Sequence, residues 1–335
     1  QLTNVTLPDD GGVISHEYDG AGRLIGRAFP SGATSSWRYE GGRLVGIEHR
    51  GPGGADIVSL AYEYNDAGKI TAIDGPVGRR VFTYDDGDRL TSVDQMRETY
   101  TYDLLRRTAS HRSDAYRFDP RGQLLEDDSH TYTYDVMGYR TTRSTGAETE
   151  TYRFTMLGEL VDYVATDGTQ TTYRFDAEGR RVTRMVGPDG VATHWFYVGA
   201  DIVLELDNDE ALAARYVHGD GDDEPLAMWR GGAWYFFHAD HQGSIRALTA
   251  ADGSVVNRYD YDSFGNATLA DEGVANPYRF TGREWDAESG LYFYRSRVYD
   301  PETGRFLGPD AEGFGARDVD LYRYALDDPL SYRDP

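Results

Sequence analysis

Two aspartates near the end of the chain could carry out chemistry if the fold brings their carboxylates together. Asp310 lies in the run GPDAEG, and Asp334 lies in the run YRDP. Two neighbouring carboxylates cannot both ionise easily, so one keeps a proton and the pair can act as base and acid on an attacking water. Asp-Pro is also a common start of a turn, so Asp310 could cap a turn and Asp334 could sit in a hairpin loop. The two motifs leave both interpretations open.

Two further clusters contain metal-ligand side chains. His238-Ala239-Asp240-His241 offers two imidazoles and a carboxylate, but on a strand His238 and Asp240 share a face while His241 points away. The acidic run from Gly219 to Glu224 offers carboxylates for calcium, yet it lacks the spacing of an EF-hand loop. A solvated loop is the favoured interpretation of that run, and the sequence predicts neither a metal nor a cofactor.

Composition and charge limit the classes of partner. The 335 residues are 39% hydrophobic, include no cysteine, and carry a formal net charge of −23. A field of that sign repels nucleic acid and anionic membranes, so no nucleic-acid partner is expected. No apolar run is long enough to span a bilayer. The first residues lack the features of a signal peptide, and we expect Gln1 to be a boundary within a longer protein.

A short aromatic motif recurs through the first two-thirds of the chain. Its form is aromatic-x-aromatic-Asp-x-x-Gly, often followed by Arg-Leu, and from Tyr64 onward the second aromatic recurs in steps of 16 to 21 residues. A repeat of this size is typical of an array of small units. Clear copies begin at His16, Tyr62, Tyr116, Tyr132 and Tyr173, and partial copies begin at Phe82, Tyr100 and Tyr152.

Each copy predicts a β-hairpin. Aromatics two residues apart share one face of a strand, the aspartate can bond backbone amides two residues on, and the glycine can adopt the left-handed conformation that closes a short loop. Consecutive hairpins would pair into one long, winding sheet with ladders of tyrosine rings. Stacked rings can also bind sugars or single strands, but core ladders are favoured here. Helix is hard to find, and only Asp207 to Arg215 is helix-tolerant.

The C-terminal third resembles the RHS-associated core domain of bacterial RHS (YD-repeat) proteins. The resemblance lies in FHADHQGSIRALTAADGSVVNRYDYDSFG from Phe237, in YRFTGREWDAESGLYFYRSRVYDPETGRFLGPD from Tyr278, and in LYRYALDDPLSYRDP from Leu321. The repeats in turn resemble the YD repeats of RHS and teneurin shells. The expected fold is therefore all-β: a wound array of YD hairpins that forms part of a β-cocoon and ends in the core. We expect a YD shell at 1–197, a connecting segment at 198–236, and the core at 237–335.

The resemblance implies one reaction and one partner. Many RHS cores cut their own backbone just downstream of the core and release a C-terminal effector inside the shell. The two aspartates assigned to that cut map to Asp310 and Asp334, with Arg305 as a residue that could orient them or form a plain structural ion pair. The implied enzyme is at most a single-turnover aspartyl self-cleaving protease. Ala311 replaces the proline that usually follows the first aspartate, and the interval to Asp334 is slightly longer than the common pattern.

The leading hypothesis is thus a shell segment of an RHS polymorphic toxin that encapsulates an effector. The effector would follow Pro335, further repeats would precede Gln1, and a delivery apparatus would be a third partner. Such a protein is expected outside a bacterial or archaeal cell or on its surface, reached through a secretion system. The alternative is a cell-surface or adhesive YD scaffold, including a filament, with no catalytic activity. A carbohydrate-active enzyme with aromatic subsites ranks last.

Overall fold

The computed structural model describes residues 1–94, 96, 98–103, 108–111, 114–188, 190–313 and 319–334. The described residues form two compact units that each combine an early and a late part of the chain. The first unit contains residues 1–82 and 213–283, and the second contains residues 83–212 and 284–334. Pro335, the last residue of the second aspartate motif, lies outside the described residues. The division expected from the sequence, at 1–197, 198–236 and 237–335, was drawn from where the repeats lie, and it stays a prediction.

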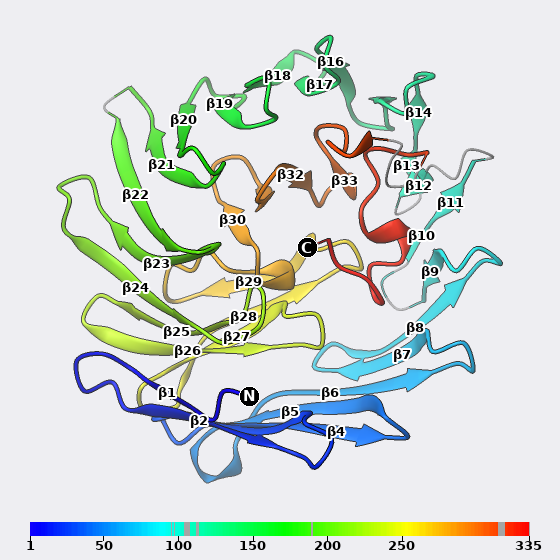
Figure 1. Ribbon diagram of the computed structural model, residues 1–335. Helices are drawn as coiled ribbons and strands as arrows, with labels where there is room; N and C mark the ends of the chain where they lie inside the picture. The colour runs from blue at the N-terminus through cyan, green and yellow to red at the C-terminus, as the bar shows by residue number, and fades with distance from the viewer. Residues whose placement is uncertain are drawn as a thin grey trace. The chain divides into compact units, whose positions relative to one another are not determined.

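The first unit is built from antiparallel strands that pair with their neighbours in chain order. Its early part pairs from β1 to β8 and its late part from β24 to β29. The two parts lie against each other, with β5 beside β26 (Figure 1). The elements are β1 (Asn4–Thr6), β2 (Val13–Tyr18), β3 (Leu24–Ala28), β4 (Thr34–Glu40), β5 (Arg43–Arg50), η1 (Pro52–Gly54), β6 (Asp56–Tyr64), β7 (Ile70–Gly75), β8 (Gly78–Tyr84), β24 (Leu212–His218), β25 (Pro225–Arg230), β26 (Ala233–Ala239), β27 (Ile245–Ala250), β28 (Val255–Tyr261), β29 (Ala267–Glu272) and η2 (Phe280–Gly282).

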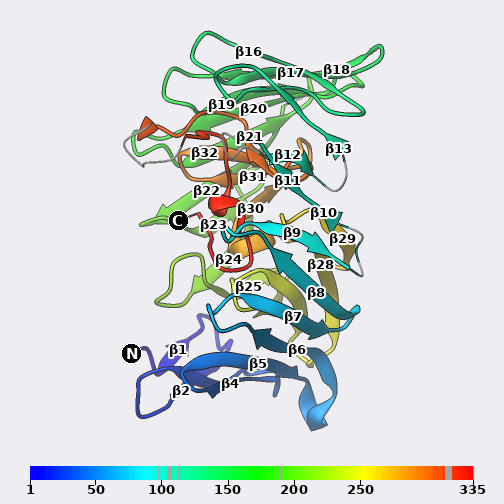
Figure 2. The same cartoon turned by 90° about the vertical axis from the view of Figure 1, so that its right-hand side faces the viewer.

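The second unit repeats this construction, with a run of hairpins and a small four-stranded sheet, β30 to β33, from the late part of the chain. Its hairpin strands β16, β17 and β18 lie side by side (Figure 2). The elements are β9 (Leu90–Val93), β10 (Glu98–Thr99), β11 (Thr101–Tyr102), β12 (Thr108–His111), β13 (Asp114–Ala115), β14 (Arg117–Phe118), β15 (Leu124–Glu126), β16 (Thr131–Tyr134), β17 (Arg140–Thr145), β18 (Glu148–Phe154), β19 (Leu160–Val164), β20 (Gln170–Phe175), β21 (Arg181–Val186), β22 (Val191–Val198), β23 (Asp201–Leu206), β30 (Glu284–Asp286), β31 (Leu291–Tyr294), β32 (Arg297–Asp300), β33 (Arg305–Phe306) and η4 (Ala325–Asp327). The all-β prediction is confirmed.

The repeat turns close as the sequence predicts. In the first copy, Oδ1 of Asp19 accepts hydrogen bonds from the backbone N–H groups of Ala21 and Arg23, both at 2.9 Å. Gly22 then adopts a φ of 82°, which a residue without Cβ reaches at little cost. The same pair of backbone contacts recurs at Asp85, Asp119, Asp135, Asp176, Asp207, Asp240 and Asp262.

The two aromatics of a repeat have different tasks. The first is buried, as at Tyr62, Tyr132 and Tyr173, and fills the core. The hydroxyl of the second donates to a backbone carbonyl of the preceding hairpin: Tyr64 to Leu44 O at 2.6 Å and Tyr197 to Arg181 O at 2.9 Å are examples. The arginine after the turn glycine completes the contact, because its guanidinium lies over the second aromatic of the next hairpin, as Arg23 does over Tyr39, Arg43 over Tyr64, Arg89 over Tyr102 and Arg180 over Tyr197.

Two features differ from the sequence interpretation. The strand register shifts by one residue just before the second aromatic in many hairpins, for example between Glu63 and Tyr64, so each such hairpin contains a β-bulge. The helix-tolerant stretch from Asp207 to Arg215 is a repeat turn followed by β24. Asp207 accepts the N–H groups of Asp209 and Ala211 at 3.0 Å each, and this turn chemistry outweighs the helix propensity of the alanines.

The core of the second unit joins the hairpins to the small sheet. Buried residues from β18 to β20 pack against Leu291, Phe293, Val298 and Leu307. Two buried ion pairs reinforce this contact. Arg140, the arginine of a repeat, lies 2.7 Å from Asp300, and Arg181 lies 2.9 Å from Asp286.

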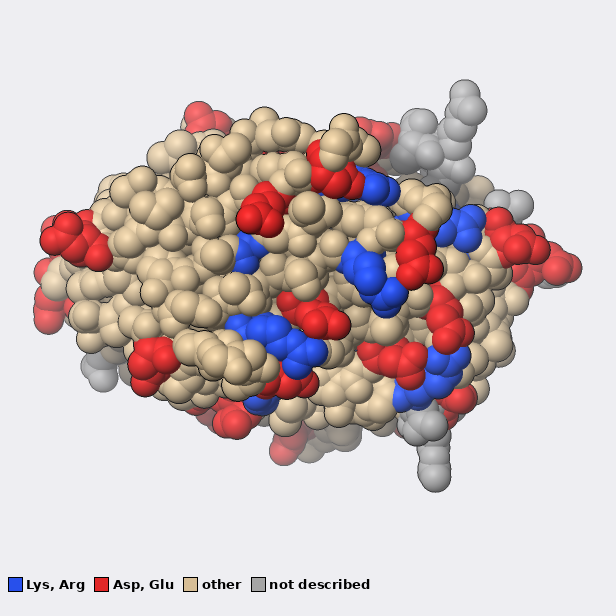
Figure 3. Space-filling view, turned by 90° about the horizontal axis from the view of Figure 1, so that it is seen from below, with Lys and Arg blue, Asp and Glu red and all other residues tan. Residues whose placement is uncertain are grey.

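Charged side chains of both signs are interspersed on the surface seen in Figure 3, with acidic ones more numerous in the sequence. This mixture explains how a chain with a net charge of −23 forms many arginine–carboxylate pairs. Across the described residues, no helix has the length and apolar character that crossing a membrane would demand.

Replacing Asp300 by asparagine is expected to destabilise the second unit by about 3–5 kcal/mol, because Arg140 would keep a buried charge without its partner. The side chains of Arg140 and Asp300 are only 1% and 2% exposed. Chemical denaturation followed by tryptophan fluorescence measures the loss. Asp167→Asn, at an exposed turn of the same unit, is the control and should change stability by less than about 0.5 kcal/mol.

The same pair predicts acid sensitivity. Burial opposes ionisation of Asp300, but the neighbouring Arg140 and Arg143 outweigh it and lower its pKa to about 2. Because the folded pKa is below the unfolded one, this carboxylate stabilises the fold above about pH 4, and about 2 kcal/mol is lost as the pH falls towards 2. Unfolding free energies measured from pH 5 to pH 2 should fall by about 2 kcal/mol more in the natural protein than in Asp300→Asn, since other carboxylates with a lowered pKa, such as Asp127, titrate in both.

Candidate functional site

The first candidate aspartate follows a tightly held backbone segment. The N–H of Phe306 donates to Tyr322 O at 3.0 Å, that of Leu307 to Val298 O at 2.9 Å, and that of Asp310 to Leu321 O at 2.9 Å. Gly308 packs flat on a ring, since a Cβ there would lie 2.3 Å from Cδ1 of Tyr139. The segment is therefore fixed on both sides, and it presents Asp310 in a defined position.

Asp310 also caps a turn, as one sequence interpretation proposed. Its Oδ1 accepts the N–H of Glu312 at 2.9 Å, and its backbone carbonyl accepts the N–H of Gly313 at 3.0 Å. Its Oδ2 points elsewhere, to Arg297. One carboxylate thus serves the local turn and a longer-range contact at the same time.

Arg297 brings the two candidate aspartates to one place. It begins β32, and its two terminal nitrogens lie 3.2 Å from Oδ2 of Asp310 and 2.6 Å from Oδ2 of Asp334. The guanidinium also lies 3.7 Å from the ring centre of Phe306, which limits its movement. Its side chain is 14% exposed, against 28% for Asp310 and 22% for Asp334, so the group is reachable by water.

Arg305 does not have the orienting position that the resemblance suggested as one option. Its guanidinium forms two bonds to Asp320, at 2.9 and 2.7 Å, and a third to Gly122 O at 3.2 Å. Burial disfavours its charge, but Asp320 outweighs that effect and raises the pKa of Arg305. Because β33 aims this side chain inward, nearness in sequence to Asp310 does not lead to contact. Arg305 is the structural ion pair that the other interpretation predicted.

Arg297 is a candidate site residue that no pattern in the sequence singled out. It stands 13 residues before Asp310, in a run of alternating aromatics and arginines, and looks like any other strand arginine. The available signal was its place at the end of a short hairpin, where Tyr294 pairs with Arg297 across a two-residue turn. That signal gives the position of the residue but not its partners.

The histidine and acidic clusters do not assemble a ligand set. His238 is buried and bonds to Thr249 at 2.9 Å, Asp240 accepts the N–H groups of its turn, and His241 packs on the ring of Tyr62. The acidic run is more engaged than the expected solvated loop, because Asp223 pairs with Arg283 and Glu224 with Arg27. Within the described ranges, no three histidine or carboxylate side chains are grouped to hold a metal ion.

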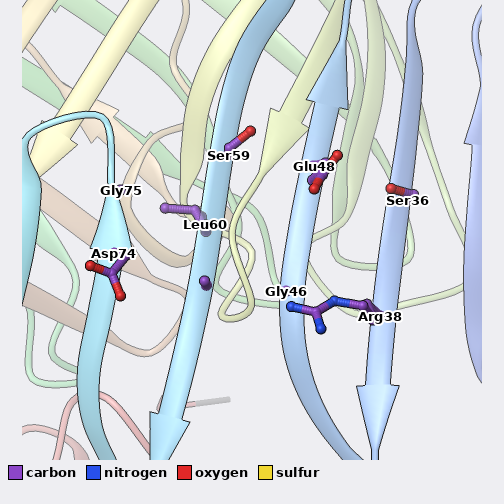
Figure 4. A pocket seen from close by; sticks show the side chains of 9 residues that line it. Ser36, Arg38, Gly46, Glu48, Ser59, Leu60, Asp74 and Gly75 are labelled. Carbon is purple, nitrogen blue, oxygen red and sulfur yellow. The ribbon is translucent and has the colours of Figure 1, made fainter.

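Two open hollows lie on sheet faces. One, of about 390 Å³, lies over β4 to β7, where Gly46 and small neighbours leave space (Figure 4). Its carboxylates Glu48 and Asp74 pair with Arg50 and Arg79, so they are not a free acid and base. The other, of about 510 Å³, lies in the second unit beside Trp195 and Phe196, and its Asp176 pairs with Arg180. Neither hollow offers the unpaired carboxylate pair that a glycosidase needs.

Several known proteins are similar to nearly the whole of this chain. The tRNA nuclease WapA of Bacillus subtilis (strain 168) is 30% identical over an alignment of 370 positions, which covers 99% of this chain and 15% of the relative. The double-stranded DNA deaminase toxin A of Burkholderia cenocepacia (strain H111) is 28% identical over 97% of this chain and 21% of its own length. The crystal structure of TcdB2-TccC3-TEV matches with a TM-score of 0.71 at 19% identity, over 99% of this chain and 20% of that one.

These matches agree on the architecture. The structural match shows the same fold, and the chain spans about a fifth or less of the lengths of these proteins. The teneurin YD-shell family model matches residues 53–330, most of the chain, and this range includes the hairpin repeats from Tyr62 onward and the segment that carries Asp310. The RHS/YD-repeat resemblance is confirmed, and the chain belongs to the teneurin YD-shell family.

Proposed function

We propose that this chain is a shell segment of a polymorphic toxin, and that Asp310 and Asp334 together cut the backbone once to free a C-terminal effector. The observation that carries the proposal is the convergence of these two carboxylates, 24 residues apart, on the guanidinium of Arg297. Upstream repeats would complete the enclosure, and the effector would follow Pro335. We place the assembled protein outside the producing cell or at its surface, reached through a delivery apparatus.

The relatives support the role of a carrier. One is named as a tRNA nuclease and another as a double-stranded DNA deaminase toxin, yet both match nearly all of this chain. Two unrelated chemistries beside one shared segment fit a segment that holds an activity encoded elsewhere in the protein. The net charge of −23 agrees with this assignment, because such a surface does not itself favour nucleic acid.

The proposed cut needs only groups on this chain and one water. One carboxylate takes a proton from the water, whose oxygen bonds to the peptide carbonyl carbon. The protonated partner donates to the leaving nitrogen as the C–N bond breaks. Arg297 contacts both carboxylates and acts as a positioning residue, with its plane held by Phe306. No second turnover follows, because the substrate bond belongs to the same chain.

A purely structural or adhesive scaffold is the second candidate, and one observation favours it. The Asp310–Arg297–Asp334 group is complete as a clamp that ties the C-terminal segment to β32, without any chemistry. The two candidates differ in a single measurable product.

The full-length natural protein should yield two fragments on a denaturing gel, and Asp310→Asn or Asp334→Asn should yield one. Asparagine at 310 keeps an oxygen for the Glu312 N–H and removes the charge. Asp135→Asn makes the same change at a repeat turn of the second unit and should leave two fragments. Intact mass fixes the cut bond. An uncut natural protein would remove the protease claim and leave the scaffold, while a cut Asp310→Asn protein would assign the reaction to other residues.

Arg297→Gln is expected to slow the cut on the order of 10²-fold, because Asp334 would lose the group that holds it beside Asp310. Arg297→Lys, which keeps the charge but not the two-nitrogen geometry, should retain part of the rate. Fragment appearance over time after synthesis measures both. Thermal unfolding of each variant separates this effect from misfolding, and an unchanged rate in folded Arg297→Gln would show that positioning does not depend on this residue.

A further inference from the structure

Three histidines lie buried together in the first unit. His16, His49 and His238 come from β2, β5 and β26, and they are 7%, 1% and 0% exposed. The rings of His49 and His238 are 5.1 Å apart at an interplanar angle of 64°. The ring of Phe29 lies 5.1 Å from His238, so the pair is enclosed by aromatic and aliphatic groups.

The hydrogen bonds of this pair suit neutral rings. Nε2 of His49 lies 3.0 Å from Ala239 O, and because a carbonyl only accepts, Nε2 carries the proton. Nδ1 of His49 then accepts from the Ser35 hydroxyl at 2.6 Å. His238 bonds through Nε2 to Thr249 at 2.9 Å, and its buried Nδ1 has no hydrogen-bond partner in the described structure. A second proton on His238 would lie at Nδ1 and lack an acceptor, and one on His49 would require the Ser35 hydroxyl to turn from donor to acceptor.

The charged groups around the pair give no compensation. Arg27 of β3 donates to Nε2 of His16 at 2.9 Å, which adds a cation next to the cluster. Its carboxylate partner Glu224, from the acidic run, is already paired with it, and Asp220 of the same run acts on His16 only at a distance. Asp240, which follows β26, is shared with the Arg246 guanidinium of β27 at 3.6 Å.

The pair also joins distant parts of the sequence. The bond from His49 to Ala239 spans 190 residues and links β5 to β26. Phe29 repeats the link through its contact with Phe236, with ring centres 5.5 Å apart. Opening this contact would detach β5 from β26, while bonds such as those from Arg258 to Ile57 O and from Arg80 to Tyr261 O would still join early and late strands elsewhere in the unit.

Burial sets the direction of the response to acid. It lowers the pKa of His49 to about 4 and that of His238 well below its ordinary value, with the nearby His49 adding to the effect on His238. An opened unit exposes both rings to water, where they bind protons below about pH 6.5. Between about pH 6.5 and pH 4 the open form binds protons and the closed form does not. The open form is therefore increasingly favoured as the pH falls through this range.

We propose that the contact between His49 and His238 is an acid-sensitive seam, which joins β5 to β26 in the first unit near neutral pH and loosens in mild acid. The seam needs no ligand, because protons bind the two rings when the opened unit exposes them to water. It is independent of the cut at Asp310 and Asp334, which belong to the second unit.

Hydrogen–deuterium exchange of the full protein at pH 7.5 and pH 5 tests the seam after correction for the intrinsic pH dependence of exchange. Peptides from β5 and β26 should exchange about 30-fold faster at pH 5 from His49 alone, given a shift of its pKa from 6.5 to about 4. Peptides from β16 to β18 in the second unit should not follow. The double variant His49→Gln, His238→Gln should lose the response, and His130→Gln, a histidine of the second unit, should keep it.

A second measurement on the natural protein covers the case in which the double variant does not fold. Deuterium exchange at the imidazole C2 position gives the titration midpoint of each histidine. Midpoints for His49 and His238 clearly below the ordinary value of 6.5 support the seam. Midpoints at or above that value, or equal protection of β5 and β26 at both pH values, overturn it.

Discussion

The polar side chain that closes the repeat turn holds this fold together. It is most often an aspartate at the end of the outgoing strand, with Asn65 and Thr155 in its place in two repeats, and by accepting backbone N–H groups it sets the length of the turn and the register of the return strand. Because the register is set, the first aromatic faces the core and the second reaches the backbone of the preceding hairpin. The arginine after the turn then stacks on the next ring. Every longer-range contact depends on this local closure.

The buried arginines show how the repeats are joined to the C-terminal segment. Arg140 and Arg181 lie one residue further from the turn than the arginines that stack on rings, and their partners are Asp300 and Asp286 of the small sheet. Two consecutive positions therefore serve hairpin-to-hairpin stacking and hairpin-to-core pairing, as Arg180 and Arg181 do in one repeat. Arg297 forms two arginine–carboxylate ion pairs within the C-terminal segment, one with Asp310 and one with Asp334, the two aspartates singled out in the sequence.

The sequence patterns predicted the features that depend on contacts between residues close together in the chain. The Asp-x-x-Gly turns and the β-hairpins followed from spacing, whereas the different tasks of the two aromatics and the bulge before the second did not, because a one-residue slip in register leaves no mark on the sequence pattern. Asp207 was missed as a turn because no aromatic precedes it. Arg305 was considered for its nearness to Asp310, but side-chain direction on β33 decides its partner, Asp320. The contacts of Arg297 with Asp310 and Asp334 became apparent only in the folded structure.

The repeat turn has a consequence for how such chains change over time. The aspartate and the left-handed residue make the turn, while the two residues between them contribute only backbone. Their side chains are therefore exposed to solvent: Val136 and Met137, between Asp135 and Gly138, are 90% and 51% exposed. Mutations at these positions can alter what the surface presents with little cost to folding. Over evolution, the exposed side chains at the hairpin turns can therefore change while the fold of the hairpins stays the same.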